Sequence, residues 1–142
     1  MASEVELKIK VPNQTQYLAL IGKIGEAVAR EMCQVPQSKD FCGSDLNVVV
    51  TEAMANAIKH ADATDPDIYV KIAINIKDNE LLVSVYDSGA GFDLDSVPIP
   101  YFESASLDES GRGLFIIRSL MDSVVYKKVN GGNVLEMKKM LA

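Results

Sequence analysis

A carboxylate and an amide four positions apart, Glu52 and Asn56, are the first residues whose types and spacing could do chemistry. The apolar residues around them recur at intervals of three and four, which predicts an amphipathic helix with both side chains on one face. An amide oxygen can bind a hard cation, and a carboxylate can act as a general base. The alternative is a half-exposed polar row beside the buried face, which is common on surface helices.

Asp87 is a second candidate, because it ends a predicted strand over residues 80–87. Alternation along this strand places the carboxylate on the side of the buried apolar residues. Gly89 and Gly91 follow and allow the backbone to turn close to a ligand. A buried carboxylate here suits recognition of a flat amine-bearing group such as adenine, and its desolvation cost favours a bound partner. The alternative is a strand end followed by a glycine-rich turn.

A third candidate is the sequence Gly111-Arg112-Gly113-Leu114, which opens a predicted short helix. Free amides at a helix N-terminus, with the positive end of the helix dipole and an arginine beside them, form an anion site. This site would need no basic surface. The alternative is a hinge with an N-cap.

The elements that must position these groups follow from periodicity and turn residues. A length of 142 residues is the usual size of one compact domain, residues 1–142. Within it, the change between three- and four-residue spacing and two-residue spacing of apolar residues predicts both helices and strands. In the first half of the chain we expect a strand within residues 1–10, a helix over 17–32, and a second helix that is capped by Ser44 or Asp45 and runs to 61. A hairpin over 68–87 follows and turns at Asp78-Asn79. After it we expect a lid over 92–110, a helix from 114, and a hairpin over 124–140 that turns at 130–132. Tight turns between consecutive strands imply a largely antiparallel sheet with helices on one face, an α+β fold.

Composition limits the classes of function. The 142 residues carry a net charge of −6, which argues against a protein that binds nucleic acid or an anionic membrane through a broad basic surface. No apolar run approaches the roughly 18 residues of a membrane span. The two cysteines, Cys33 and Cys42, suggest neither a disulfide framework nor a zinc site, so we expect a reducing cytoplasm.

In this order the three motifs resemble the nucleotide site of the GHKL ATPases. Residues 52–61 match the N box, residues 87–91 the Asp-x-Gly-x-Gly box, and residues 111–114 a further glycine box. Within that superfamily the chain is most similar to the anti-sigma factor serine/threonine kinases of bacterial partner-switching modules, through Asn-Ala-Ile-Lys-His-Ala and residues 110–122. The resemblance implies a Bergerat-type ATP-binding fold, a two-layer α/β sandwich with a mixed, mostly antiparallel sheet.

The resemblance also implies a role for each matched residue. Asn56 would bind the Mg ion that bridges the phosphates of ATP, Glu52 would be the base that activates the attacking hydroxyl, and Asp87 would accept a hydrogen bond from the adenine amino group. The remaining expected ATP-binding residues shape the pocket and lid or approach the phosphates: Gly89, Gly91, Gly111, Arg112, Gly113, Leu114, Lys59 and His60. For Lys59 and His60, a solvated lysine and a packed histidine remain comparable alternatives.

The chain departs from the family pattern at two places. The last box usually has Gly-Thr, whereas here Asn133 follows Gly132, and we expect Asn133 to offer a hydrogen bond toward the base. Some of these kinases also carry a phosphate-binding arginine early in the first helix, where this chain has residues 17–20, Tyr-Leu-Ala-Leu. Either phosphoryl transfer is slower or Arg112 compensates.

The resemblance predicts a protein kinase that uses Mg-ATP to phosphorylate an anti-sigma factor antagonist and that sequesters a sigma factor in its other state. We expect a homodimer formed through the helix and sheet edge away from the lid. Two alternatives remain: a switch kinase that regulates a downstream phosphatase, and a nucleotide-gated binding module without useful catalysis. A detached histidine-kinase domain is disfavoured because the one histidine, His60, lies inside the N box.

Overall fold

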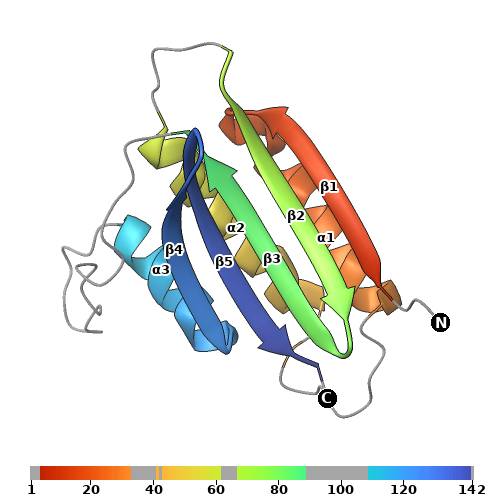
Figure 1. The fold of residues 1–142 in the computed structure, drawn as a ribbon. Helices are drawn as coiled ribbons and strands as arrows, with labels where there is room; N and C mark the ends of the chain where they lie inside the picture. The colour runs from red at the N-terminus through yellow and green to blue at the C-terminus, as the bar shows by residue number, and fades with distance from the viewer. Residues whose placement is uncertain (1–3, 33–40, 42, 62–66, 89–108, 142) are drawn as a thin grey trace.

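The computed structural model describes residues 4–32, 41, 43–61, 67–88 and 109–141. Its five strands form one sheet in the order β1-β2-β3-β5-β4, and each neighbouring pair is antiparallel. The strands are β1 (Val5–Pro12), β2 (Tyr69–Lys77), β3 (Glu80–Asp87), β4 (Ser123–Val129) and β5 (Gly132–Met140). Figure 1 shows β1 and β4 at the two edges of this sheet.

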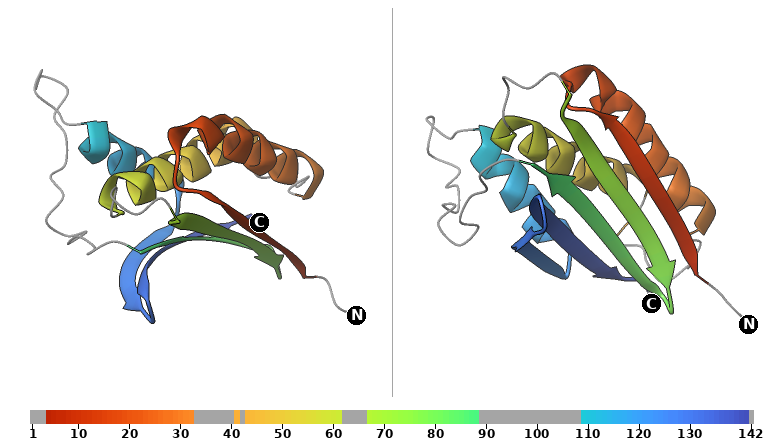
Figure 2. Two further views of the ribbon diagram at one scale, coloured as in Figure 1. Left: turned by 90° about the horizontal axis from the view of Figure 1, so that it is seen from above. Right: turned by 45° about the horizontal axis from the view of Figure 1, so that its top comes forward.

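Three α-helices among the described residues cover one face of the sheet, and Figure 2 shows them as a separate layer above it. They are α1 (Leu18–Met32), which follows a short 3-10 helix η1 (Thr15–Tyr17), α2 (Gly43–His60) and α3 (Glu109–Leu120). The expected two-layer α+β sandwich is therefore confirmed. The sheet of the described residues is antiparallel throughout and not mixed, because each of its strand pairs runs in opposite directions.

Alternation along the strands explains which side of the sheet the helices cover. In β2, Val70, Ile72 and Ile74 are at most 2% exposed and face the helices, whereas Tyr69 and Lys71 are exposed on the other face. The turn to β3 uses Asp78 and Asn79 at φ 52° and 62°, as their tolerance of positive φ predicts. Since a one-residue slip would expose the apolar side chains, burial fixes the register that carries Asp87 inward.

The central helix α2 supplies much of the core. Its buried positions recur at helical spacing: Leu46, Val49, Val50, Ala53, Met54, Asn56 and Ala57. Full burial of one large apolar side chain stabilises a fold by about 1.5–3 kcal/mol, so this face holds α2 firmly against α1 and the sheet. Asn56 is the one polar residue in this buried row, and the core therefore fixes where its side chain lies.

Several predicted element boundaries are wrong. Helix α2 begins at Gly43, so Ser44 and Asp45 lie in its first turn, where the Asp45 charge favours the positive helix end. Strand β1 extends to Pro12, which an edge strand tolerates because its outer amides need no partner. Helix α3 begins at Glu109, so the glycine box lies inside the helix. The predicted lid falls almost entirely outside the described residues.

Candidate functional site

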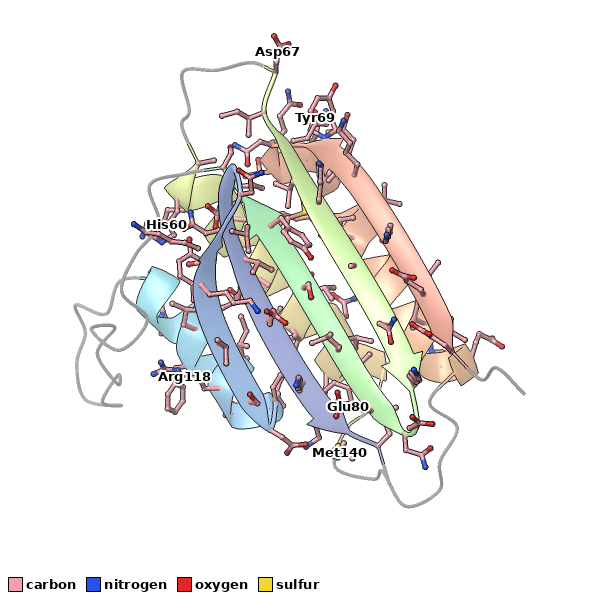
Figure 3. The ribbon with its side chains drawn as sticks, in the orientation of Figure 1. His60, Asp67, Tyr69, Glu80, Arg118 and Met140 are labelled. Atoms are coloured by element: carbon pink, nitrogen blue, oxygen red, sulfur yellow. The ribbon has the colours of Figure 1, made fainter. Side chains whose placement is uncertain are left out.

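The candidate residues gather at one end of the molecule, where the last turns of α2, the first turns of α3 and the end of β3 meet. The end of α2 and the start of α3 lie side by side in both views of Figure 2. Figure 3 shows His60, the last residue of α2, on this side of the molecule. Three segments that are far apart in the sequence are therefore brought together by the helix layer.

Glu52 and Gly113 form the contact between α2 and α3. A Cβ atom built on Gly113 would lie 2.6 Å from Glu52 Oε2, closer than real Cβ atoms approach a neighbour. Gly113 is buried, and Glu52 is partly exposed. The missing side chain at position 113 thus provides the room that the Glu52 carboxylate occupies, and this contact links the N box to the glycine box.

Asn56 lies one helical turn after Glu52 and is 7% exposed. Its side-chain oxygen, Oδ1, is buried and has no hydrogen-bond partner among the described residues. A buried acceptor without a partner costs about 1–3 kcal/mol, so such atoms are rare unless something binds them. A carbonyl-type oxygen is a ligand that Mg²⁺ accepts, and Asn56 therefore fits the metal that the resemblance implies.

Asp87 ends β3 with its carboxylate held from two other strands. Tyr126 of β4 donates its hydroxyl to Oδ2 at 2.9 Å, and the side-chain amide of Asn133, on β5, donates to Oδ1 at 3.0 Å. Asp87 and Asn133 are 7% and 2% exposed. Burial, followed by the hydrogen bond and the charge of Asp87, raises the pKa of Tyr126 above its ordinary value, so this hydroxyl stays a donor at neutral pH.

Gly132, at the start of β5, lies directly against the backbone of Asp87. A Cβ atom there would overlap the carbonyl oxygen of Asp87 and lie 3.1 Å from the Cα atom of Ser88. Since neither of these backbone groups can rotate away, position 132 accepts no side chain without moving the end of β3. The glycine therefore sets how closely Asn133 approaches the Asp87 carboxylate.

Lys59 and His60 end α2 beside this cluster. Burial lowers the pKa of His60, the charge of Lys59 lowers it further, and the charge of Asp87 opposes both effects. His60 is therefore near enough to Asp87 to sense its charge. Lys59 is exposed, whereas His60 is partly buried.

The glycine box is placed differently from the prediction. Because α3 begins at Glu109, Gly111 lies in the first turn, whose amides lack partners within the helix, whereas Gly113 lies beyond it. Arg112 is exposed and Leu114 is 3% exposed in the hydrophobic core. Gly89 and Gly91 lie outside the described residues.

The site is an open corner of polar groups and not a ready-made metal cage. No cluster of three or more acidic, histidine or cysteine side chains occurs among the residues with described placement. A hollow of about 150 Å³ at the end of the sheet is lined by Asp87, Ser88 and Asn133 together with residues of the uncovered face, among them Tyr69, Lys71 and Tyr86.

A larger hollow of about 540 Å³ lies on the uncovered face of the sheet, with Lys8, Lys10, Lys71 and Tyr86 in its lining. None of the predicted site residues lines it. Buried carboxylate and amide groups are a better guide to chemistry than the size of a surface hollow, so we place the site at the corner between α2, α3 and β3.

One residue of this cluster was missed by the sequence analysis. Tyr126 lies in the closing hairpin, 39 positions from Asp87, and no motif includes it. The signal that could have revealed Tyr126 is the length of the hairpin turn, because this length sets the strand register. Pairing of Val129 with Gly132 leaves a two-residue turn and places Tyr126 opposite Leu135, on the helix-covered face. The predicted three-residue turn would have shifted the strand by one position and turned Tyr126 to the other face.

Comparisons with known proteins show the family of the chain. Residues 11–139 match the family model described as histidine kinase-like ATPase domain. The anti-sigma F factor of Geobacillus kaustophilus (strain HTA426) is 30% identical, over 100% of this chain and 95% of that protein. The serine-protein kinase RsbW of Bacillus subtilis (strain 168) is 32% identical, over 90% of this chain and 81% of that protein. RsbW of Staphylococcus epidermidis is 29% identical, over 93% and 85%.

No helix among the described residues combines the length and the apolar character needed to cross a bilayer.

Proposed function

Since the chain belongs to the histidine kinase-like ATPase domain family, and within it to the anti-sigma factors and serine-protein kinases, we propose that it is an anti-sigma factor with ATP-dependent serine/threonine protein kinase activity. It phosphorylates an anti-sigma factor antagonist and, in its other state, sequesters a sigma factor. The names of the similar proteins, anti-sigma F factor and serine-protein kinase, support both halves of this proposal.

The observation that carries the proposal is the buried Oδ1 atom of Asn56, which has no described partner. It lies one turn from the Glu52 carboxylate, on the helix whose apolar face fixes the Asn56 side chain. A base and a cation ligand in this arrangement suit phosphoryl transfer, in which catalysis is mostly positioning and charge neutralisation.

Each residue of the corner has a role in this proposal. Asn56 holds the Mg ion, which when bound neutralises charge on the ATP phosphates. Glu52 accepts the proton of the substrate hydroxyl and orients its oxygen for attack. Asp87 accepts a hydrogen bond from the adenine amino group. The expected phosphate contacts come from Lys59, His60, Gly111 and Arg112, while Gly89, Gly91, Gly113 and Leu114 shape the pocket.

The partners and the assembly are also part of the proposal. Residues 1–142 form one domain that works in the cytoplasm without binding nucleic acid or membrane directly, consistent with a net charge of −6. The chain acts as a homodimer joined along β1 and α1. Support comes from the position of β1 at the sheet edge and from Leu7 and Leu20, which are 36% and 48% exposed there.

The test is phosphorylation of the antagonist protein from the same organism. The protein is incubated with Mg-ATP labelled on the γ-phosphate and with the antagonist, and the phosphorylated residues are identified. The proposal predicts labelled serine or threonine on the antagonist. Nucleotide binding without any labelled antagonist would favour a nucleotide-gated binding module. If phosphorylation of the antagonist activates a phosphatase, and the protein binds no sigma factor in the presence of ATP, the result would favour the switch kinase.

A further inference from the structure

The carboxylate of Asp87 is held by two donors from different strands, and only one of them belongs to a motif of the family. Asn133 stands where the family usually has threonine, directly opposite Asp87 in the β3–β5 register. Tyr126 lies on the next strand, opposite Leu135, and its phenol extends past β5 to reach Oδ2. Tyr126 and Asn133 thus bind different oxygens of Asp87, with hydrogen bonds of ordinary length, 2.9 and 3.0 Å.

These two contacts fix the orientation of the carboxylate. An ionised carboxylate can only accept hydrogen bonds. Two bonds from fixed strands also prevent rotation of the group about its Cβ–Cγ bond. Such a carboxylate still has acceptor capacity for a further donor, because its two oxygens offer about four lone-pair sites.

We propose that Tyr126 and Asn133 are positioning residues that hold Asp87 as a fixed acceptor and so set the preference of the site for a base with an amino group over one with a carbonyl group. This inference rests on the proposed function, in which Asp87 receives the adenine amino group. Guanine presents a carbonyl oxygen at the position where adenine presents its amino group, and a fixed, ionised carboxylate repels it. A carboxylate free to rotate would discriminate less.

Asn133 and Tyr126 divide this task. Asn133, at 2% exposure, reaches Asp87 from the neighbouring strand. The hydroxyl of a threonine at position 133 would extend less far than the asparagine amide. Tyr126 supplies a second donor at Oδ2, and its raised pKa keeps it protonated beside the Asp87 charge. The phenol thus completes a site in which the usual threonine is absent.

The experiment measures the affinities of Mg-ATP, Mg-GTP and Mg-tripolyphosphate by calorimetry for the wild-type protein and for Tyr126→Phe. The variant keeps the ring and loses only the donor. Because a hydrogen bond to a charged group is stronger than one between neutral groups, we expect ATP affinity to fall about tenfold and the ATP-to-GTP preference to shrink. Affinity for tripolyphosphate, which has no base, should stay unchanged. Val125→Thr is the control on the same strand, because this side chain is exposed and lines neither hollow.

Two further variants separate positioning from stability. Asn133→Thr restores the family's hydroxyl and should keep ATP affinity within about threefold, whereas Asn133→Leu should lose the ATP-to-GTP preference. In an Asp87→Asn background, Tyr126→Phe should have no further effect on ATP affinity, because the carboxylate that it positions for the adenine amino group is absent. Equal ATP affinity and equal preference in wild type and Tyr126→Phe would overturn this inference and leave the proposed function intact. Failure of the wild-type protein to bind ATP would overturn the proposed function itself.

Discussion

Glu52 Oε2 lies where the side chain of residue 113 would be, 2.6 Å from a Cβ atom built on Gly113. The contact joins α2 to α3 and places the proposed base against the glycine box. Because the atom that would clash is the far end of a flexible side chain, a methyl group at position 113 displaces the carboxylate without breaking the helix packing. The position of the Glu52 carboxylate therefore depends on the absence of a side chain at position 113.

Gly113→Ala should slow phosphoryl transfer while ATP affinity changes little. Displacement of a general base removes part of a contribution that is commonly about a hundredfold or more, so we expect kcat to fall at least about tenfold. The free energy of unfolding should not fall, because alanine is favoured over glycine inside a helix by up to about 1 kcal/mol. Single-turnover transfer, calorimetry and urea unfolding measure the three quantities. Ser119→Ala, at an exposed position of the same helix, is the control. An unchanged rate would show that the Glu52 position is not set by Gly113.

Asn56→Leu should change affinity and stability in opposite directions. Loss of the amide oxygen removes the proposed metal ligand, so Mg-ATP affinity should fall at least about tenfold, since hydrogen bonds or ligands to charged groups are among the stronger single contacts. The binding of ATP in the presence of a chelator should be the same for both proteins. The free energy of unfolding should be equal or higher, because the buried Oδ1 atom has no described partner to lose.

A matched control for this variant is Asn47→Leu on the same helix. The Asn47 amide donates to Glu26 Oε2 at 3.0 Å and accepts from Thr51 at 3.2 Å, so its removal should lower the free energy of unfolding and leave Mg-ATP affinity unchanged. If Asn56→Leu were as destabilising as Asn47→Leu, Asn56 would be a structural hydrogen-bonding residue and not a ligand.

His60 should titrate below its ordinary pKa of 6.5. It is the single histidine of the chain, so its ring resonance in the NMR spectrum needs no assignment. Asp87→Asn should lower its pKa further, because the Asp87 charge favours the protonated ring, whereas Lys59→Gln should raise it, because the Lys59 charge opposes protonation. Shifts in the same direction in both variants would show that His60 does not lie between these charges.

The lowered pKa of His60 also predicts how stability depends on pH. The neutral ring is favoured in the folded state, so the stabilisation is complete above the unfolded pKa of 6.5 and is lost as pH falls through the folded pKa. The urea midpoint of the wild-type protein should therefore fall more between pH 7 and pH 5 than the midpoint of His60→Gln. Parallel changes in the two proteins would contradict this prediction.

The parts of the site that lie on one strongly periodic element could be predicted from the sequence. The spacing along α2 places Glu52 and Asn56 on adjacent turns, and alternation along β3 turns Asp87 inward, because burial of the apolar neighbours leaves no other register. The positive φ values of Asp78 and Asn79 follow from side chains that tolerate this conformation. These are local consequences of the chain.

Contacts between distant elements could not be predicted in the same way. The bond from Tyr126 to Asp87 depends on the length of the β4–β5 turn, and one residue more in that turn would place the phenol on the other face of the sheet. The start of α3 at Glu109 is a second case, since glycines in a sequence usually indicate a helix end. Here Gly113 is needed inside the helix because Glu52 occupies the space beside it. The packing of α3 on α2 thus explains why a glycine is needed at position 113.

The most direct test of the proposed kinase is single-turnover transfer of the γ-phosphate from Mg-ATP to the antagonist protein by the wild-type protein and by Glu52→Gln. The substitution keeps the size of the side chain and removes the base. If Glu52 accepts the proton of the attacking hydroxyl, the variant should bind ATP within about threefold of wild type and transfer phosphate at least about a hundredfold more slowly. A transfer rate equal to that of the wild-type protein would contradict the account.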